Sequence, residues 1–392
     1  MCIRDSNGDY IYIFLQASYD RINTNVRGTG IPHVDPDILW NLEVPLPPFA
    51  EQQRIVAKVE DLLARVNAAR KNLSKLPTIL KRFRQSVLAA ACSGRLTEEW
   101  RCLNPDVPCG ADLLRQIQGV RLASADSSRE KNQIADAFRE TAWTGAGDEL
   151  GIDDIPESWT VCRVGAIGTV VNGSTPSRKM DSFWGGDIPW VSSGEVRNNI
   201  IRDTRERITK AGYDNSSVRL LPAGTVLLAM IGEGKTRGQS ALLEIDATIN
   251  QNSAAILLNR DYVSSEFLWR WLQFQYEMTR ERGSGSGPQA LNCQRVRELP
   301  FLLPPLLEQH EIVRRVERLL ALADTIEKQV AAGTARAENL TQAILAKAFR
   351  GELVPTEAEL ARQEGRTYEP ASALLARIRA QREGPVHDRR RT

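Results

Sequence analysis

The stretch AMIGEGKT, residues 229–236, contains the residue types that most directly suggest chemistry. With Ala229 in place of the first glycine, Gly234, Lys235 and Thr236 nearly complete a phosphate-binding loop, whose backbone amides and lysine cradle phosphates. Such a loop must open directly into a helix, because the helix N-terminus meets the phosphates. Here the chain continues RGQSALLEIDATINQNSAAILL, a pattern of strands and turns. We therefore expect a loop between strands, with a nucleotide hydrolase as the alternative.

The composition provides few other groups for catalysis. Among 392 residues there are three histidines, and the six cysteines are scattered without a C-x-x-C pair. This argues against a metal site and a disulfide framework. The 51 Lys and Arg residues nearly balance the 49 Asp and Glu residues, so any basic surface must be local. No apolar run approaches the ~18 residues of a membrane span, and no targeting segment is evident, so we expect a cytoplasmic protein.

A loop with cationic and amide side chains between two strands can instead contact DNA. Such side chains bind backbone phosphates and the edges of bases. Single surface cations are usually only solvated, so these residues are selected by their type and their placement in loops, not by a motif. The candidates for DNA contact are Arg178, Lys179, Arg197, Lys235, Thr236, Arg237, Gln239, Asn250 and Gln251.

The elements around these candidates indicate a mixed domain rich in strands. Residues 156–304 alternate short β-prone runs with turn signals, as in GDIPWVSSGEV and GTVLLAMIGEG. The segment SEFLWRWLQFQYEMTRE predicts one helix at 265–281, and we expect Trp159 and Trp190 to lie in the core.

The sequence also contains a long internal repeat. VPLPPFAEQQRIVAKVEDLL, from Val44, aligns with FLLPPLLEQHEIVRRVERLL, from Phe301, at an offset of 257 residues. The same offset relates Gly94 to Gly351, and a slightly larger one relates ADLLRQI at 111 to SALLARI at 372. A register of this length indicates duplication. About a hundred residues at the start of the second copy have no counterpart in the first, so we expect an N-terminally truncated product whose opening MCIRDS is not native.

Within each copy the apolar residues follow two interleaved seven-residue series, which predicts coiled-coil helices. A helix over 51–92 would span ~63 Å, with a kink or a lost hydrogen bond at Pro77. Small residues of one copy tend to align with large residues of the other, which predicts an antiparallel pair of helices within one chain. A simple dimerisation coiled coil is the plainer alternative. The predicted seam contains Ile55, Val59, Leu62, Val66, Leu73, Leu76, Leu80, Phe83 and Val87, then Ile312, Val316, Leu319, Ile326, Val330, Leu340 and Ile344.

The duplicated plan resembles the specificity subunit of type I restriction-modification systems. The resemblance rests on PLPPFAEQQRIVAKVEDLL, LLPPLLEQHEIVRRVERLL and the endings RFRQSVLAAACSGRLT and NLTQAILAKAFRGELV. NGSTPSRKMDSFWGGDIPWVSSGEV and AGTVLLAMIGEGKTRG further resemble that family's target recognition domains. The resemblance covers residues from about 10 to 351.

The resemblance implies an α+β fold in which strand-rich target recognition domains are joined by long antiparallel coiled-coil spacer helices, with a pseudo-twofold internal repeat. It implies a non-catalytic subunit that reads one half of a bipartite double-stranded DNA site, with the spacer helices as ruler and docking surface. Methyltransferase subunits and an endonuclease-translocase subunit are the implied partners, and S-adenosylmethionine, ATP and magnesium are expected in those partners, not in this chain. The predicted segments are 1–46, a remnant of the first recognition domain; 47–95, the first spacer helix; 96–155, a polar linker; 156–304, the second recognition domain; 305–351, the second spacer helix; and 352–392, a C-terminal tail, expected to be disordered.

Two further alternatives remain open. The chain could serve a related methyltransferase or a fused restriction enzyme, which a neighbouring methyltransferase gene would help to decide. It could also be a scaffold whose coiled coil joins partners without reading DNA.

Overall fold

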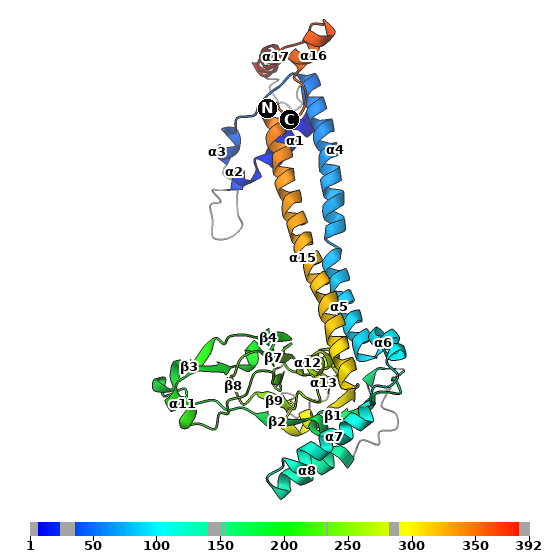
Figure 1. Cartoon of the computed structure of the whole chain (residues 1–392). Coiled ribbons are helices and arrows are strands. Elements are labelled where there is room, and N and C mark those ends of the chain that lie inside the picture. Colours follow the sequence, from blue (N-terminus) through cyan, green and yellow to red (C-terminus); the bar gives the residue numbers. More distant parts are fainter. Residues whose placement is uncertain are drawn as a thin grey trace, which may run out of the picture. The chain divides into compact units, whose positions relative to one another are not determined.

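The computed structural model describes residues 7–23, 36–139, 150–152, 154–232, 234–281 and 290–383, and the expected MCIRDS remnant lies outside this part (Figure 1). The chain divides into two compact units, which we describe separately. Unit 1 comprises residues 1–79 and 325–392, and unit 2 comprises residues 80–324. The division falls within α15 (Leu306–Phe349), a single helix with residues in both units.

Unit 2 contains the strands of the described structure, arranged in two sheets and a strand pair. The larger sheet has the order β2-β9-β6-β7-β4, in which only β4 and β7 pair in parallel. The smaller sheet has the order β5-β3-β8, and β1 pairs with β10. The strands are β1 (Thr160–Arg163), β2 (Gly168–Asn172), β3 (Trp184–Val191), β4 (Asn199–Ile201), β5 (Glu206–Ile208), β6 (Val226–Ala229), β7 (Ser240–Leu243), β8 (Thr248–Ile249), β9 (Ser253–Leu258) and β10 (Pro300–Leu303).

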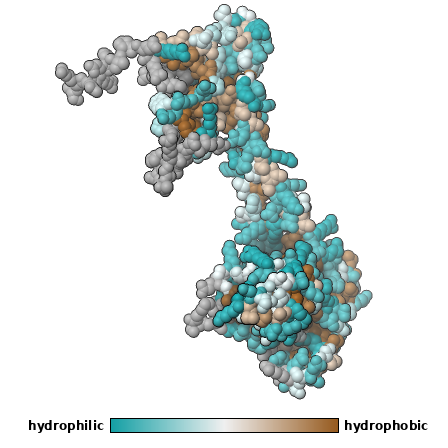
Figure 2. All heavy atoms as spheres, turned by 90° about the vertical axis from the view of Figure 1, so that its left-hand side faces the viewer, coloured by the Kyte–Doolittle hydropathy of each residue, from teal (hydrophilic) through white to brown (hydrophobic). Residues whose placement is uncertain are grey.

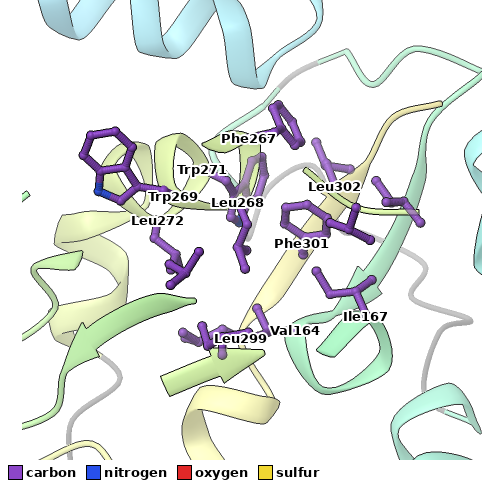
Figure 3. Close-up of a cluster of buried hydrophobic side chains, with 14 of the residues drawn as sticks. Val164, Ile167, Phe267, Leu268, Trp269, Trp271, Leu272, Leu299, Phe301 and Leu302 are labelled. Atoms are coloured by element: carbon purple, nitrogen blue, oxygen red, sulfur yellow. The ribbon is translucent and has the colours of Figure 1, made fainter. Parts of the chain in front are cut away.

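The core of unit 2 forms where helix α12 (Ser265–Phe274) meets β10. Figure 3 shows Phe267 and Trp271 of this helix beside Phe301 of the strand, and both ring pairs have centroids 5.7 Å apart. The Trp271 indole donates a hydrogen bond to the Pro300 carbonyl at 2.9 Å, which satisfies its buried N–H group. Aromatic packing therefore fixes α12 against the strand pair.

The single helix predicted at 265–281 is in fact two helices. α12 ends at Phe274, and α13 (Tyr276–Glu281) follows after Gln275. The Gln275 side chain is buried and donates to the Leu150 carbonyl at 3.2 Å. This tertiary hydrogen bond lies at the interruption and has no signature in the local sequence.

The segment 96–155, predicted to be a polar linker, contributes helices that pack on unit 2. Helix α7 (Gly110–Ala123) begins where the Gly110 amide donates to the Ser158 carbonyl at 2.7 Å. A Cβ atom at Gly110 would lie 2.1 Å from the Leu303 carbonyl oxygen, so the helix and β10 are in direct backbone contact. Leu113 and Ile117 of α7 are buried in the same core as Phe301. The segment is therefore part of the domain.

Unit 1 is helical in its described part. Helix α1 (Gly8–Ala17) packs its Tyr10 and Phe14 rings against Phe349, with centroids 5.4 and 5.1 Å apart. Ile55 and Val59 of α4 (Phe49–Leu73) are buried with these residues. The remaining helices of the two units are α2 (Tyr19–Asn23), α3 (Pro36–Trp40), α5 (Leu76–Cys92), α6 (Glu98–Leu103), α8 (Ser128–Arg139), α10 (Val164–Ile167), α11 (Lys210–Asp214), α14 (Cys293–Arg297), α16 (Glu357–Glu364) and α17 (Ala371–Glu383), with 3-10 turns η1 (Arg95–Thr97), η2 (Asp181–Phe183) and η3 (Ser193–Glu195).

The tail expected to be disordered is helical in its described part. α16 has a capping box in which Thr356 and Glu359 bond reciprocally, and Leu374 of α17 is fully buried. These helices follow α15 as α6 and α7 follow α5, so the repeat continues through them. The terminal HDRRRT lies outside the described residues.

The repeat is reproduced in hydrogen bonds. α1 and α12 have the same length and are related by the 257-residue offset found in the sequence. The Gln52 side-chain oxygen accepts from the amide of Asn7, the N-cap of α1, at 3.0 Å, as Gln309 accepts from Ser264, the N-cap of α12, at 2.8 Å. Each glutamine also donates to the carbonyl of the proline five positions earlier, at 2.8 and 2.9 Å. The duplication therefore extends back to residue 7.

The helix pairing is antiparallel in each unit. In unit 1, Arg70 of α4 pairs with Glu338, and a Cβ at Gly333 would lie 3.3 Å from the Leu73 side chain, a small residue facing a large one. In unit 2, Arg84 of α5 pairs with Asp324 at 2.7 Å.

The break expected at Pro77 is present, because α4 ends at Leu73 and α5 begins at Leu76. One seam residue is wrong: Leu340 is 51% exposed, whereas Ala337 and Ile344 are buried. A helix with 3.6 residues per turn drifts by ~20° per heptad from a strict seven-residue repeat, which moves Leu340 out of the contact.

The first turns of α15 also contain a charged cluster. Glu311 accepts hydrogen bonds from Arg314 and Arg315 at distances of 2.6–2.7 Å. The bond from Arg314, followed by that from Arg315, lowers the pKa of the Glu311 carboxyl to about 2 despite its partial desolvation.

Candidate nucleic-acid interface

The most structured of the candidate residues is Arg178, in the loop between β2 and η2. Its guanidinium lies 3.7 Å from the centre of the Trp184 ring and 5.0 Å from that of Trp190. The two indoles pack edge to face and donate to the carbonyls of Ser177 and Ser174 in that loop. The indole pair therefore holds both the loop and the arginine.

Arg178 is fixed on its other side by Glu206 of β5. The two side chains form a two-point ion pair, of which one hydrogen bond measures 2.9 Å. The hydrogen bond from Arg178 lowers the pKa of Glu206, and the same bond raises the pKa of Arg178, so both stay charged. The pair uses two of the five guanidinium N–H donors, and the Arg178 side chain remains 52% exposed. An oriented cation with free donors is thus presented to solvent.

The structure brings one other candidate loop to Arg178. Gln251, in the turn between β8 and β9, is exposed and accepts a hydrogen bond from the Thr175 hydroxyl of the Arg178 loop. Lys179 is exposed in the same loop. The candidate Asn250 is different, because its side chain is only 7% exposed. Its oxygen accepts from the Asn252 amide and the Ser253 hydroxyl, so the Asn250 side chain shapes the turn.

The candidates of the Gly234–Lys235–Thr236 stretch lie in a hairpin turn between β6 and β7. The chain passes from this turn into β7 (Ser240–Leu243) without an intervening helix, which removes the phosphate-binding geometry. Lys235 is exposed, whereas Thr236 and Gln239 are half-buried.

The candidate Arg237 is only 8% exposed, so its side chain presents little surface to a DNA duplex in this structure. The physical reason is that Arg280 of α13 donates to the carbonyls of Gly234 and Arg237 at 2.8 and 3.2 Å, which draws the turn against the helix. The Tyr276 hydroxyl of the same helix donates to the Lys235 carbonyl at 2.6 Å.

Arg197 lies apart from both groups, near the start of β4. It is exposed, and its guanidinium donates to the Gly194 carbonyl. Within the described part of the chain, no hydrogen bond or ion pair joins Arg197 or Lys235 to Arg178. The structure therefore gathers Arg178, Lys179 and Gln251 and leaves the other exposed candidates separate.

Two arginines that the sequence analysis missed line a polar cavity at the end of β2. The cavity measures about 460 Å³ and is lined by Arg219 and Arg297 together with Asn172, Ser174 and Ser217. Arg297 donates to the Val170 carbonyl at 3.0 Å. The two arginines are 78 residues apart in the sequence, so only the fold shows that they share a site. The basic last turn of α14, which contains Arg297, was the one available signal.

Gly173 sets the wall of this cavity. A Cβ atom there would lie 2.0 Å from the Ile249 carbonyl oxygen, so only glycine permits this approach of the loop to β8. The Ser174 amide then donates to the same carbonyl at 3.0 Å. This backbone contact places the Arg178 loop beside the cavity.

The fold combines a mixed α+β domain with long paired helices and an internal repeat. The family model described as "Type I restriction modification DNA specificity domain" matches residues 2–76 and 156–332, and the chain belongs to this family. One matched range falls in each of the two copies found in the sequence.

Several known proteins are similar to this chain. It is 31% identical to the type I restriction enzyme EcoDI specificity subunit of Escherichia coli over 393 residues, which cover 95% of this chain and 76% of that protein. It is also 31% identical to the EcoBI specificity subunit of Escherichia coli, with 96% and 72% covered. A chain from a solved structure of the type I R-M system has 19% identity and a TM-score of 0.59, with 88% of this chain and 72% of that chain covered, a likeness of fold. In the described part of this chain, no helix is both long and apolar enough to cross a membrane.

Proposed function

We propose that this chain is the DNA-sequence-recognition subunit of a type I restriction-modification complex and that residues 156–304 read one half-site. The observation that carries the proposal is the Arg178 cluster, in which a half-exposed guanidinium lies on two indoles beside the Gln251 loop. A planar guanidinium with free donors suits the two acceptors of guanine in the major groove. Holding it in place before binding reduces the entropy lost on binding DNA.

The surrounding cations have a different role in this proposal. Lys179 and Arg219 are exposed, and within the described residues neither has an ion-pair partner. Such side chains bind phosphates, which position the domain without reading sequence. With a net charge of only +2, this chain relies on its partners for further phosphate contacts.

Catalysis belongs to the partner subunits in this proposal. Methyltransferase subunits supply S-adenosylmethionine, and an endonuclease-translocase subunit uses ATP and magnesium. The paired helices α4, α5 and α15 set the spacing between half-sites and present a docking surface. In this proposal the complex acts in the cytoplasm, where it meets double-stranded DNA.

The test is selection from random duplex DNA by this chain co-purified with its methyltransferase partner, at ~150 mM salt to suppress non-specific binding. We expect one short half-site to be enriched. Arg178→Ala should relax the preference at one base pair, with a loss of ~1–3 kcal/mol in discrimination. Arg202→Ala is the matched control, because Arg202 is an exposed, ion-paired arginine of the same domain, bonded to Glu244.

Failure to enrich any sequence in a stable complex would favour the scaffold alternative. Equal effects of the two arginine substitutions would exclude a reading role for Arg178. The nucleotide hydrolase makes a separate prediction, a rise in melting temperature with millimolar ATP that Lys235→Ala abolishes. We expect no rise, because the turn does not lead into a helix.

A further inference from the structure

The cavity at the end of β2 contains two arginines and no opposite charge. Among the described residues that line it, Arg219 and Arg297 are cationic and none is acidic. Burial raises the pKa of the Cys293 thiol, although Arg297 opposes this shift, so the thiol is neutral and does not balance the arginines. Like charges in a concave site concentrate the electrostatic field there. The cavity therefore attracts an anion.

Three uncharged side chains of the same cavity also have no partner in the protein. Within the described part of the chain, the side chains of Asn172, Ser174 and Ser217 form no hydrogen bond with another residue. An amide and two hydroxyls can each donate a hydrogen bond, and the ionised oxygens of a phosphate accept such bonds strongly. The donors around the arginines therefore match a phosphate group.

Arg297 is held in place from two elements. Its guanidinium donates to the Val170 carbonyl of β2 at 3.0 Å and to the Gln294 side chain of α14 at 3.4 Å. Within the described residues these bonds use two of its five N–H donors, which leaves three for a ligand. The repeat-equivalent residue is Trp40, the last residue of α3, so the duplicated framework does not require an arginine here. Arg297 is therefore a feature of the second copy alone.

The lining of the cavity favours the DNA backbone over a base. Its volume of about 460 Å³ lies within the range of ligand-binding cavities in proteins. None of the described residues that line it is aromatic, so no ring is present on which a base could stack. The end of unit 2 that carries β3 and α11 faces the viewer in the lower part of Figure 2 and is mainly hydrophilic. A sugar-phosphate segment therefore suits this cavity better than a base does.

The cavity and the Arg178 loop share one support. The Trp190 indole donates to the Ser174 carbonyl at 3.1 Å, and the centre of its ring lies 5.0 Å from the Arg178 guanidinium. Only three residues separate Ser174 from Arg178. Because Trp190 contacts both the wall of the cavity and the arginine, a DNA strand bound in the cavity lies at a constant distance from Arg178.

We propose that this cavity, which we call the β2–α14 cavity, binds a phosphodiester of the DNA strand whose base faces Arg178. The inference rests on the proposed DNA-reading function. Arg219 and Arg297 are positioning residues that neutralise the phosphate, and the neighbouring amide and hydroxyl groups donate to its oxygens. The bound phosphate fixes the register in which Arg178 meets a base. Since a phosphate contact carries no sequence information, its loss weakens binding to all sequences alike.

The first experiment uses Cys293 as a reporter inside the cavity. The chain co-purified with its methyltransferase partner is treated with N-ethylmaleimide, and modification of each cysteine is followed by mass spectrometry. Cys293 is half-buried, whereas Cys102 is exposed on α6 and serves as the internal standard. With duplex DNA at ~10 times its Kd, modification of Cys293 should slow ~10-fold, because the occupied site excludes the reagent. The rate at Cys102 should not change.

Inorganic phosphate is tested alone in the same assay, because it offers the same ionised oxygens. Protection of Cys293 by DNA, with or without protection by phosphate, supports the proposal. Protection by phosphate but not by DNA would overturn it, since the cavity would then bind a free anion and not the DNA backbone. Equal rates in all samples would also overturn it. In the double variant Arg219→Gln and Arg297→Gln the protection should disappear at equal DNA occupancy, and persistent protection would show that DNA covers the cavity without entering it.

The second experiment measures how the affinity for DNA depends on salt. The same double variant should reduce the slope of log Kd against log salt concentration by ~1, which corresponds to ~5-fold weaker binding at ~150 mM salt for preferred and scrambled DNA alike. The matched control replaces Arg202 and Arg207 by glutamine, since both are exposed arginines of the same domain that pair with carboxylates. Replacing Arg219 and Arg297 by lysine keeps the charge and should restore the slope. A lowered melting temperature with an unchanged slope would show a purely structural role and would refute the site.

The cavity and the proposed DNA-reading function fail in different ways. The salt slope can be measured on DNA of any sequence, so it tests the cavity even if the chain prefers none. An unchanged slope in a double variant that still selects one half-site refutes the cavity and leaves the reading function. A wild-type chain that shows protection of Cys293 but selects no sequence refutes the reading function and leaves the phosphate site.

Discussion

Substitution of Glu308 tests whether one buried carboxylate organises unit 2. Its side chain is fully buried and accepts from the Thr97 hydroxyl at 2.7 Å, Arg101 at 2.6 Å and the Trp159 indole at 2.9 Å. These donors come from η1, α6 and the residue before β1. A single side chain of α15 therefore ties the paired helices, the 96–155 segment and the recognition domain together within unit 2.

Glu308→Ala should lower the free energy of unfolding of unit 2 by ~3–5 kcal/mol. The buried Thr97 and Trp159 donors each lose their acceptor, at ~1–3 kcal/mol per group. Arg101 loses its charge partner, and breaking a buried pair costs ~3–5 kcal/mol. Summed, these losses would reach ~5–11 kcal/mol. We expect the smaller loss because Arg101 is 19% exposed, lines a cavity of about 280 Å³ that can admit water, and keeps its hydrogen bond to the Gly94 carbonyl.

Urea denaturation followed by tryptophan fluorescence measures this loss, since seven of the eight tryptophans fall within residues 80–324. The repeat provides the matched control. Glu51→Ala removes the same residue type from the same position of unit 1, where one described backbone amide bonds to it. We expect a loss of ~1–2 kcal/mol or less there. If Glu308→Ala lowers the stability of unit 2 by under ~1 kcal/mol, the three-donor network does not hold the unit together.

Three further predictions use pairs of positions or a pH difference. Gly110→Ala should destabilise unit 2 by ~2 kcal/mol or more, because the new methyl group clashes with a strand carbonyl. Gly119→Ala lies on the same helix and meets no atom within 4 Å, so it should stabilise unit 2 by up to ~1 kcal/mol. Thermal denaturation compares the two variants. Ile344→Ala should lower the free energy of unfolding by ~2–4 kcal/mol and Leu340→Ala by under ~0.5 kcal/mol, as measured by urea denaturation. Equal losses would show that Leu340 belongs to the seam. The lowered pKa of Glu311 means that its contribution is present above its ordinary pKa of 4.5 and is lost as the pH falls toward about 2. The stability difference between the wild type and Glu311→Gln should therefore shrink over that interval, and a constant difference would contradict the ion pairing.

The long elements and the duplication could be predicted from the sequence because their signals are periodic. The heptad pattern predicted the helices α4, α5 and α15, and Pro77 predicted the break between α4 and α5. Leu340 was misplaced because a strict seven-residue series ignores the drift of a straight helix. Gln275 ended α12 through a hydrogen bond to residue 150, a contact that no local pattern encodes.

The site was predictable only in part, because residue type does not determine burial. In the sequence, Arg178 and Arg237 are both arginines in loops between strands. In the structure, Arg178 packs on two indoles with half of its side chain exposed, whereas Arg237 is buried. What separates them is a third element: β3 supplies the indoles beneath Arg178, whereas α13 closes the turn over Arg237. Arg219 and Arg297 share a cavity only because the chain returns after 78 residues.

The two glutamates at the start of the paired helices show most directly why this limit is physical. Glu51 and Glu308 follow the same two prolines, precede the same glutamine, and are both buried. Both belong to a P-P-x-x-E-Q motif, but Glu308 receives three side-chain donors, whereas Glu51 receives a backbone amide. The local sequence places a carboxylate near the start of α4 and of α15. The segments packed against that carboxylate determine which donors form hydrogen bonds with it. The energetic importance of the motif therefore depends on its tertiary partners, which is why the same substitution is expected to cost unit 2 several times more than unit 1.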